Sequence, residues 1–372
     1  MESFFIAATG QNIGKTTTCL GLVSGLKQRV KTVGFMKPVG QEHVETETGE
    51  HVDKDVVLFK HYFKLKFPYE AMSPVLFPKG FTRDFLDKRV DHEDMVQKIH
   101  KGFAVIQATS QVTVIEGTGH TGVGSIVNLN NAQVAKLLGL PMILIASGGL
   151  GSSIDQLSLN FANCEKYQVR VAGVILNRVL EEKRDMILNY VSLALKRWNI
   201  PLLGAIPYSE FLNMPSMRDF ESLFQTELLC GNEFALRHFE HMRIAASSVE
   251  VYRTTLAPHQ LIITPAGRED IILATLTRFW DLKISHPEED LHTGLILTGK
   301  MPPKDSLVQQ MKTAKIPVIY VPLSSFAVMK MINNYSLKIR NEDLEKIHEA
   351  VKIVENHIDF ETLEKALRKS NP

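Results

Sequence analysis

The 372-residue sequence has few cysteines, no excess of charge of either sign and no long apolar run. Its three cysteines, Cys19, Cys164 and Cys230, are widely separated and show no metal-ligand spacing, so we interpret them as buried thiols in a reducing cytosol. The 42 Lys and Arg residues balance 41 Asp and Glu residues, which excludes a global field that would attract nucleic acid or an anionic membrane. The sequence contains no uninterrupted run of about 18 apolar residues, so we expect no membrane span. The N-terminus lacks the features of a signal peptide, so we expect a cytoplasmic protein.

The first half of the chain alternates short apolar runs with helical patterns. Several runs are continuous in Val, Ile and Leu, which is typical of parallel strands covered by helices on both faces. The pattern therefore predicts a doubly wound α/β domain with a mainly parallel sheet. The predicted strands are residues 4–8, 32–37, 112–116, 142–147, 171–177 and 202–207, and the predicted helices are 16–27, 130–138 and 153–166.

A second, smaller α/β pattern follows, with predicted strands at 260–264, 294–298 and 317–321. One predicted helix begins at residue 270, and three others span 304–314, 341–356 and 361–369. We predict three parts: a nucleotide-binding domain at 1–210, a linker at 211–244 and a smaller α/β domain at 245–372. The linker carries an apolar set that is too rich for a free tether, so we expect it to pack on a domain or a partner, and we expect a homodimer. The set is Phe211, Met214, Met217, Phe220, Leu223 and Phe224.

The strongest motif is an apolar strand that runs into a turn ending Gly14-Lys15-Thr16, at which a helix begins. In this context backbone N–H groups and a helix N-terminus cradle phosphates, the lysine supplies a cation to the β and γ oxygens, and the threonine hydroxyl ligates Mg²⁺. The usual first glycine of the motif falls on Thr9, so the loop is a variant. The predicted nucleotide-binding residues of the loop are Thr9, Gly10, Gln11, Asn12, Ile13, Gly14, Lys15, Thr16 and Thr17.

Other polar residues follow the predicted strands of this domain. Lys37 stands at the carboxyl end of the second strand, where ligands of open α/β sheets bind, and could contact the γ-phosphate or an anionic co-substrate. Glu116 ends the third strand, as a Walker-B carboxylate does, and is a predicted magnesium ligand. Asp55 could be a second metal ligand or a helix N-cap, and Asp53 competes for either role. Asn177 could read a purine edge or form a plain turn.

These residues together resemble dethiobiotin synthetase and, more broadly, the SIMIBI P-loop group that includes cobyrinic acid a,c-diamide synthase. The likeness spans roughly residues 1–210 and includes the loop, the KPVG stretch and the IEGTG strand end. It implies ATP and Mg²⁺ as cofactors, catalytic roles for Lys15 and Lys37, and metal ligands at Thr16, Asp55 and Glu116, with Asn177 near the base. The chain departs from the synthetases at Ala8 and at Gln41, in the region that helps to hold their diamino acid.

The second half resembles a DRTGG domain through the stretches LIITPAGREDIILATL, GLILTGKMPP and IPVIYVPLSSFAVMKMI. The pairing of the two domains resembles the N-terminal part of long bacterial phosphate acetyltransferases. Nothing in residues 1–372 resembles their acyltransferase domain, so acetyl transfer is not implied. The naming motif is degenerate, because Gly267 stands where an acidic residue should precede Arg268. The strand ends at 264–268 and 298–300 could bind a small-molecule effector or be ordinary loops, and Arg268 could equally form a salt bridge.

Two functions follow from the sequence. The first is a Mg-ATP-binding, nucleotide-dependent regulatory or metabolic protein without acetyltransferase activity. The second is an ATP-dependent ligase or synthetase that acts on a carboxylate or carbamate. The two differ in turnover, because a regulatory protein needs only slow ATP hydrolysis, whereas a ligase needs a second substrate facing the γ-phosphate. The residues leave this choice and the identity of any co-substrate open.

Overall fold

We describe a computed structural model of the protein, which covers residues 2–368. The chain forms two compact units. The first unit comprises the chain up to Ser209 together with the segment that begins at Ile339, and the second unit is Glu210–Lys338.

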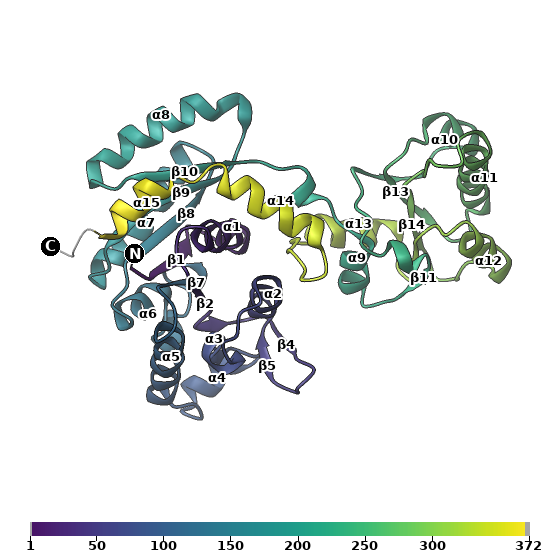
Figure 1. The fold of residues 1–372 in the computed structure, drawn as a ribbon. Helices are drawn as coiled ribbons and strands as arrows, with labels where there is room; N and C mark the ends of the chain where they lie inside the picture. The colour runs from purple at the N-terminus through teal and green to yellow at the C-terminus, as the bar shows by residue number, and fades with distance from the viewer. Residues whose placement is uncertain (1, 369–372) are drawn as a thin grey trace. The chain divides into compact units, whose positions relative to one another are not determined.

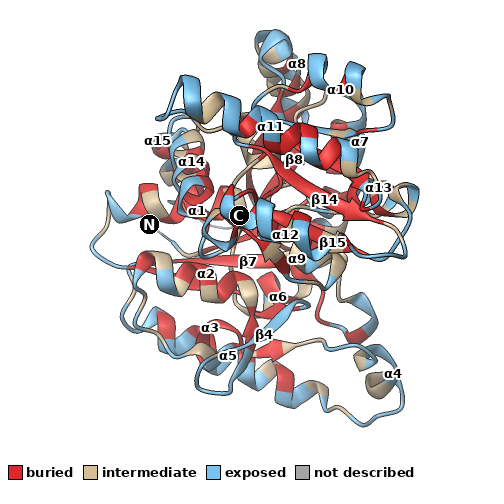
Figure 2. Cartoon of the chain, turned by 90° about the vertical axis from the view of Figure 1, so that its right-hand side faces the viewer, coloured by how far each residue is buried: buried red, intermediate tan, exposed pale blue. Residues whose placement is uncertain are grey.

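The first unit is built on a six-stranded sheet with the strand order β10-β9-β8-β1-β7-β2. All neighbouring strands are parallel. The sheet is buried along most of its length, as Figure 2 shows for β7 and β8. The predicted doubly wound α/β fold is therefore confirmed. The strands are β1 (Phe4–Ala8), β2 (Val33–Met36), β7 (Val112–His120), β8 (Met142–Ser147), β9 (Val171–Val179) and β10 (Leu202–Pro207).

The direction in which the chain crosses the sheet decides where its helices lie. From β1 the chain passes over β7 to reach β2, and it then returns stepwise through β7, β8 and β9 to β10. Because parallel connections are right-handed, helix α1 covers one face and the returning helices cover the other. This winding leaves the α1 face without a crossover helix above β9 and β10. The helices are α1 (Lys15–Lys27), α5 (His92–Gln107), α6 (Asn131–Leu137), α7 (Gly151–Lys166) and α8 (Arg184–Leu195).

Two helices from the end of the chain fill that position. Helix α14 (Leu344–Glu355) packs along α1 and contacts β10, and α15 (Phe360–Arg368) contacts β9 and β10. Figure 1 shows both helices, in yellow, beside the sheet and the purple α1. The sequence-based assignment of these helices to the second domain is wrong, because they cover apolar surface that the first unit leaves open. Residue 369, the predicted end of the last helix, lies outside the described residues.

Two glycines of α1 let α14 and α15 approach closely. A Cβ atom at Gly21 would come closer to Val354 than the 3.0 Å that real Cβ atoms keep. A Cβ atom at Gly25 would meet the ring of Phe360 in the same way. Glycine lowers helix propensity by about 1 kcal/mol relative to alanine, so close packing of the terminal helices explains why α1 contains both glycines.

The second unit contains a five-stranded sheet with the order β11-β15-β14-β13-β12, parallel except for the edge strand β11. One face packs against α10, α11 and α12, and the other packs against α9 and α13. The strands are β11 (Leu228–Cys230), β12 (His241–Ile244), β13 (Gln260–Pro265), β14 (Gly294–Thr298) and β15 (Val318–Val321). The helices are α9 (Met217–Phe224), α10 (Val249–Thr255), α11 (Glu269–Ser285), α12 (Asp305–Thr313) and α13 (Ser325–Asn333).

The predicted linker at 211–244 belongs to the second unit. It contains α9 and the strands β11 and β12, which form the two edges of the five-stranded sheet. Met217 and Phe220 are fully buried in the core of that unit, and Leu223 and Phe224 pack against it. The apolar character of this segment is thus explained by its own fold and gives no reason to expect self-association.

Within residues 2–368, no helix combines the length and the apolarity that crossing a bilayer requires.

The close packing of α1 can be tested with two glycine-to-alanine variants. Gly25→Ala should lower the free energy of unfolding by about 1–3 kcal/mol, because the new methyl group meets the Phe360 ring. Gly151→Ala, at the start of α7, should have no such cost, because a Cβ atom there meets nothing within 4 Å. Urea unfolding of both variants measures the difference. Equal stability of the two variants would contradict the packing that we describe.

Candidate functional site

The loop between β1 and α1 has the geometry that close approach to a ligand requires. Gly14 has φ 93° and ψ 37°, in the left-handed region, and α1 begins at the next residue. Among residues 2–368, no side-chain hydrogen bond caps the start of this helix, so the N–H groups of its first turn remain for another acceptor. A helix N-terminus with uncapped N–H groups favours an anion by hydrogen bonding and by its dipole.

Asn177, at the carboxyl end of β9, supports this loop from behind. Its Nδ2 donates to the carbonyl oxygen of Ile13 at 2.7 Å, and its Oδ1 accepts from the N–H of Arg178 at 2.9 Å. A Cβ atom at Gly14 would collide with Nδ2. The structure therefore shows Asn177 bracing the loop backbone, and a role in reading a purine remains a prediction. Thr9, at the start of the loop, is held by a hydrogen bond from its hydroxyl to Gln156 Oε1 at 3.1 Å.

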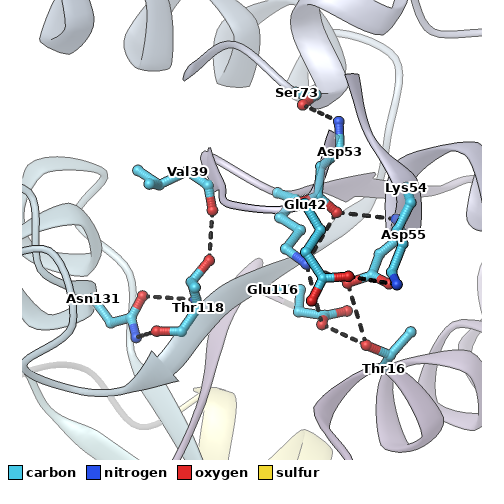
Figure 3. Close-up of polar contacts among 11 residues, drawn as sticks. Thr16, Val39, Glu42, Asp53, Lys54, Asp55, Ser73, Glu116, Thr118 and Asn131 are labelled. Carbon is cyan, nitrogen blue, oxygen red and sulfur yellow. Dashed lines mark hydrogen bonds and ion pairs between the residues drawn. The ribbon is translucent and has the colours of Figure 1, made fainter. Parts of the chain in front are cut away.

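Beside the loop, a hydroxyl and two carboxylates from three different elements come together. The Thr16 hydroxyl, in the first turn of α1, donates to Glu116 Oε1 at 2.9 Å and lies 3.4 Å from Asp55 Oδ2. Figure 3 shows these side chains pointing toward one another. Glu116 belongs to β7, and Asp55 belongs to α2 (Lys54–Phe63). The structure thus brings together the three residues that the sequence predicts as metal ligands.

The two aspartates have separate roles. Asp53 is the N-cap of α2, and its Oδ1 accepts from the N–H of Asp55 at 3.0 Å. Its own N–H donates to Ser73 Oγ at 3.0 Å. Asp55 is therefore not the helix cap, and its carboxylate faces Thr16. The structure thus assigns the cap to Asp53, and the role of Asp55 as a metal ligand remains a prediction.

Lys37 lies among these carboxylates. The register of the sheet places Met36 opposite Ile115, so the residue after β2 comes beside Glu116. The ammonium of Lys37 forms ion pairs with Asp53 Oδ1 at 3.1 Å and with Asp55 Oδ2, and it lies 4.0 Å from Glu116 Oε1. Burial alone would lower the pKa of Lys37, but the carboxylates of Asp55, Asp53 and Glu116 outweigh it and raise this pKa well above its usual value.

Glu116 is the least compensated charge of the site. Its side chain is 1% exposed, and Oε2 has no hydrogen-bond partner among the described residues. Burial raises the pKa of Glu116 to about 7, although Lys37 acts in the opposite direction. A buried carboxylate oxygen without a partner is costly unless a cation or a donor reaches it.

Lys15 is a second lysine of the site, and its ammonium group is not engaged by other described residues. Burial lowers its pKa, an effect that the Glu116 carboxylate opposes. Among residues 2–368, no hydrogen bond or ion pair holds its ammonium group. Its charge is therefore available to an anion at the loop, whereas the charge of Lys37 is committed to carboxylates.

The donor set fits a magnesium ion that arrives with phosphates. Within the described part of the chain, no three His, Cys, Asp or Glu side chains converge so as to hold a metal by themselves. Mg²⁺ commonly binds through one or two carboxylates together with substrate phosphates, and it prefers oxygen ligands. Thr16, Asp55 and Glu116 supply such oxygens, and the unpartnered Oε2 of Glu116 gives a further one.

The loop after Glu116 is braced by residues that the sequence did not indicate. The Thr118 hydroxyl donates to the carbonyl oxygen of Val39 at 2.6 Å. Asn131, buried in α6, donates to the carbonyl oxygens of Thr118 and His120 at 2.8 and 2.7 Å. These contacts fix the segment after Lys37 against the segment after Glu116 (Figure 3). No spacing rule connects Asn131 to this site, so only the fold reveals its role.

In the second unit, the two strand ends expected to form an effector site are engaged locally. Arg268 makes a two-pronged ion pair with Asp270, with both nitrogen–oxygen distances 2.8 Å. Thr298 Oγ1 and Ser325 Oγ lie 2.7 Å apart. Of the two roles left open for Arg268, the structure shows the salt bridge, and effector binding there remains a prediction.

The strand, loop and helix together with Lys15, Thr16 and Glu116 define a nucleotide-binding domain of the P-loop NTPase class. Residues 2–216 match the family described as AAA domain, and residues 222–335 match the DRTGG domain. The chain belongs to this AAA-domain family, whose model covers more than half of it.

Curated relatives extend the likeness over both units. A phosphate acetyltransferase of Nitrosomonas europaea is 26% identical over 386 residues, covering 98% of this chain and 52% of that protein. The chain thus spans about half the length of the phosphate acetyltransferases it matches. The ATP-dependent dethiobiotin synthetase BioD of Xanthomonas campestris pv. campestris is 25% identical over 206 residues, covering 55% of this chain and 91% of that protein. Among solved structures, the MinC:MinD cell division complex of Aquifex aeolicus aligns with a TM-score of 0.38 at 15% identity, covering 57% of this chain and 84% of that chain.

The two roles of Asn177 can be separated by nucleotide specificity. Asn177→Ala removes the hydrogen bond to Ile13 and leaves a carbonyl group unpaired, which costs about 1–3 kcal/mol. If Asn177 only braces the loop, adenosine and guanosine triphosphates should lose affinity by the same factor in calorimetric titrations. A loss confined to one of the two nucleotides would show that the side chain reads the base instead.

Proposed function

We propose that the first unit binds Mg-ATP at the loop 9–17 and that the protein acts as a nucleotide-dependent regulatory or metabolic protein. The observation that carries this proposal is the convergence of the Thr16 hydroxyl, Asp55 and the buried, incompletely paired Glu116 beside an uncapped helix N-terminus. Asp55 and Glu116 are buried with Lys37 as their paired cation, and Glu116 Oε2 has no hydrogen-bond partner among the described residues, which supports the binding of a further cation in function.

In this proposal each residue has a defined part. The backbone of the loop and the first turn of α1 bind the phosphates, and Lys15 neutralises their charge. Thr16, Asp55 and Glu116 would hold Mg²⁺, which when bound would supply positive charge against the phosphates. Asn131 and Thr118 keep Glu116 and Lys37 in register across the neighbouring strands.

The choice of adenine and of a regulatory role rests on relatives. One relative carries ATP dependence in its printed name, and we extend that nucleotide to this chain. The phosphate acetyltransferase relatives align over both units, which supports the joint action of an ATP-binding unit and a DRTGG unit. An ATP-dependent ligase acting on a carboxylate or carbamate would use the same phosphate site. The departures at Ala8 and Gln41 make dethiobiotin formation the less favoured of these reactions.

Lys15→Ala tests the phosphate site. Losing the charge partner of a phosphate costs about 2–5 kcal/mol, which lowers affinity roughly 30-fold or more. The matched control is Lys31→Ala, which removes the same charge from an exposed position after α1 and should bind Mg-ATP as the wild type does. Isothermal titration calorimetry measures both. Unchanged affinity in Lys15→Ala would remove the proposed function.

Glu116→Gln tests the metal site. Because the variant loses a negative charge that would hold Mg²⁺, the affinity for Mg-ATP should fall about tenfold, or 1.4 kcal/mol. ATP binding in the presence of EDTA should be unchanged or stronger, since the removed charge repels phosphates. The comparison needs titrations with and without Mg²⁺ on one protein preparation. An equal loss under both conditions would mean that Glu116 is structural and is not a metal ligand.

A further inference from the structure

The carboxylate oxygens that the proposed function assigns to Mg²⁺ already face the ammonium group of a lysine. Asp55 Oδ2 lies 3.4 Å from the Thr16 hydroxyl and also pairs with the ammonium of Lys37. Glu116 Oε1 accepts from the same hydroxyl at 2.9 Å and lies 4.0 Å from that ammonium. The lysine and the Thr16 hydroxyl therefore share both oxygens that the proposed function assigns to Mg²⁺.

Charge balance explains why a lysine lies there. Asp53, Asp55 and Glu116 are each less than a tenth exposed, as is Lys37 itself. Such carboxylates without a counter-charge would strongly destabilise the fold. Lys37 is the one described cation that forms ion pairs with all three, so in the absence of a metal it carries the electrostatic balance of the site.

A second position for the lysine is present in the structure. Asp53 is fixed as the N-cap of α2 through Oδ1, and its Oδ2 is buried without a hydrogen-bond partner among the described residues. Lys37 Nζ already contacts Asp53 at 3.1 Å. Asp53 therefore has a spare acceptor that could take more of the ammonium's hydrogen bonds if the lysine left Asp55 and Glu116.

We propose that Lys37 is the resident cation of the metal site in the nucleotide-free protein, and that it yields Asp55 and Glu116 when Mg²⁺ binds while staying paired with Asp53. This inference rests on the proposed function, since it concerns the regulation of the same site. It divides the three carboxylates into two that serve the metal and one that retains the lysine.

The exchange makes metal binding depend on the nucleotide. A metal ion alone must displace an internal ion pair and gains only two carboxylates. A metal ion that arrives with a triphosphate brings its own anionic ligands, and the displaced lysine then lies near added negative charge instead of being left uncompensated. The nucleotide-free protein should consequently be stable without divalent cations and bind them weakly.

The test measures metal binding without nucleotide. Mn²⁺ prefers the same oxygen ligands as Mg²⁺, and the free ion can be counted by electron paramagnetic resonance. Lys37→Gln should bind Mn²⁺ at least tenfold more tightly than the wild type, equivalent to about 1.4 kcal/mol. Mg²⁺ should also raise the melting temperature of this variant and leave that of the wild type unchanged.

Lys54→Gln is the matched control. Lys54 is next to Asp53 in the chain, and its ammonium pairs with Glu42 at 2.5 Å in a partly exposed position. This variant loses the same charge from the same segment and should keep the wild-type affinity for Mn²⁺. Equal affinities of Lys37→Gln and the wild type would overturn the proposal, and so would an equal gain in Lys54→Gln.

A structure of the wild-type protein with Mg²⁺ and a non-hydrolysable ATP analogue decides the matter if Lys37→Gln does not fold. We expect Lys37 beyond ion-pair distance of Asp55 and still paired with Asp53. A bound metal on Asp55 with Lys37 still paired to that carboxylate would refute the exchange. The Mn²⁺ titration uses no nucleotide, so its result is distinguishable from a failure of ATP to bind, which would refute the proposed function alone.

Discussion

The structure of the site depends on the buried ion-pair cluster of Lys37 with Asp53, Asp55 and Glu116. The members come from three stretches of chain, with Lys37 after β2, Asp53 and Asp55 at the start of α2, and Glu116 in β7. The pairing of β2 with β7 sets Lys37 beside Glu116, and the capping of α2 by Asp53 turns Asp55 toward Thr16. Because a buried charge tolerates little displacement from its partner, this cluster ties the loop, β7 and α2 into one arrangement.

The phosphate loop is a consequence of the same sheet. The strands β1, β8 and β9 are neighbours, so the loop that follows β1 and the Asn177 that ends β9 meet at one edge. The backbone of Gly14 adopts a left-handed conformation that few residues tolerate, and Asn177 fills the space that a side chain there would need. Both features restrict the backbone of the loop by contacts within the protein, and such restriction reduces the entropy that binding must overcome.

The chain order of the fold has a further consequence. The second unit interrupts the first, since the chain leaves the six-stranded sheet after β10 and returns as α14 and α15 to cover it. The ends of the second unit are therefore both fixed to one domain. Gly21 and Gly25 of α1 face Val354 and Phe360, so the core of the first unit includes residues that follow the second unit in the chain.

The sequence by itself determined most strands of the two sheets and the loop and strand ends at which the candidate site lies. Continuous apolar runs predicted β1, β8, β10 and β14 with the bounds that the structure has, because parallel strands covered on both faces are apolar at nearly every position. The Gly14-Lys15-Thr16 turn and the polar residues after the strands predicted the position of the site, because ligands of open α/β sheets bind at the carboxyl ends of the strands. Tertiary structure alone decided the rest. The pattern of an amphipathic helix shows that one face is buried but does not show which surface buries it. The positions of α14 and α15 therefore follow only from the face of the sheet that is left uncovered above β9 and β10. The separate roles of Asp53 and Asp55, and the position of Lys37 among three carboxylates, likewise depend on distances across the sheet that no spacing along the chain contains.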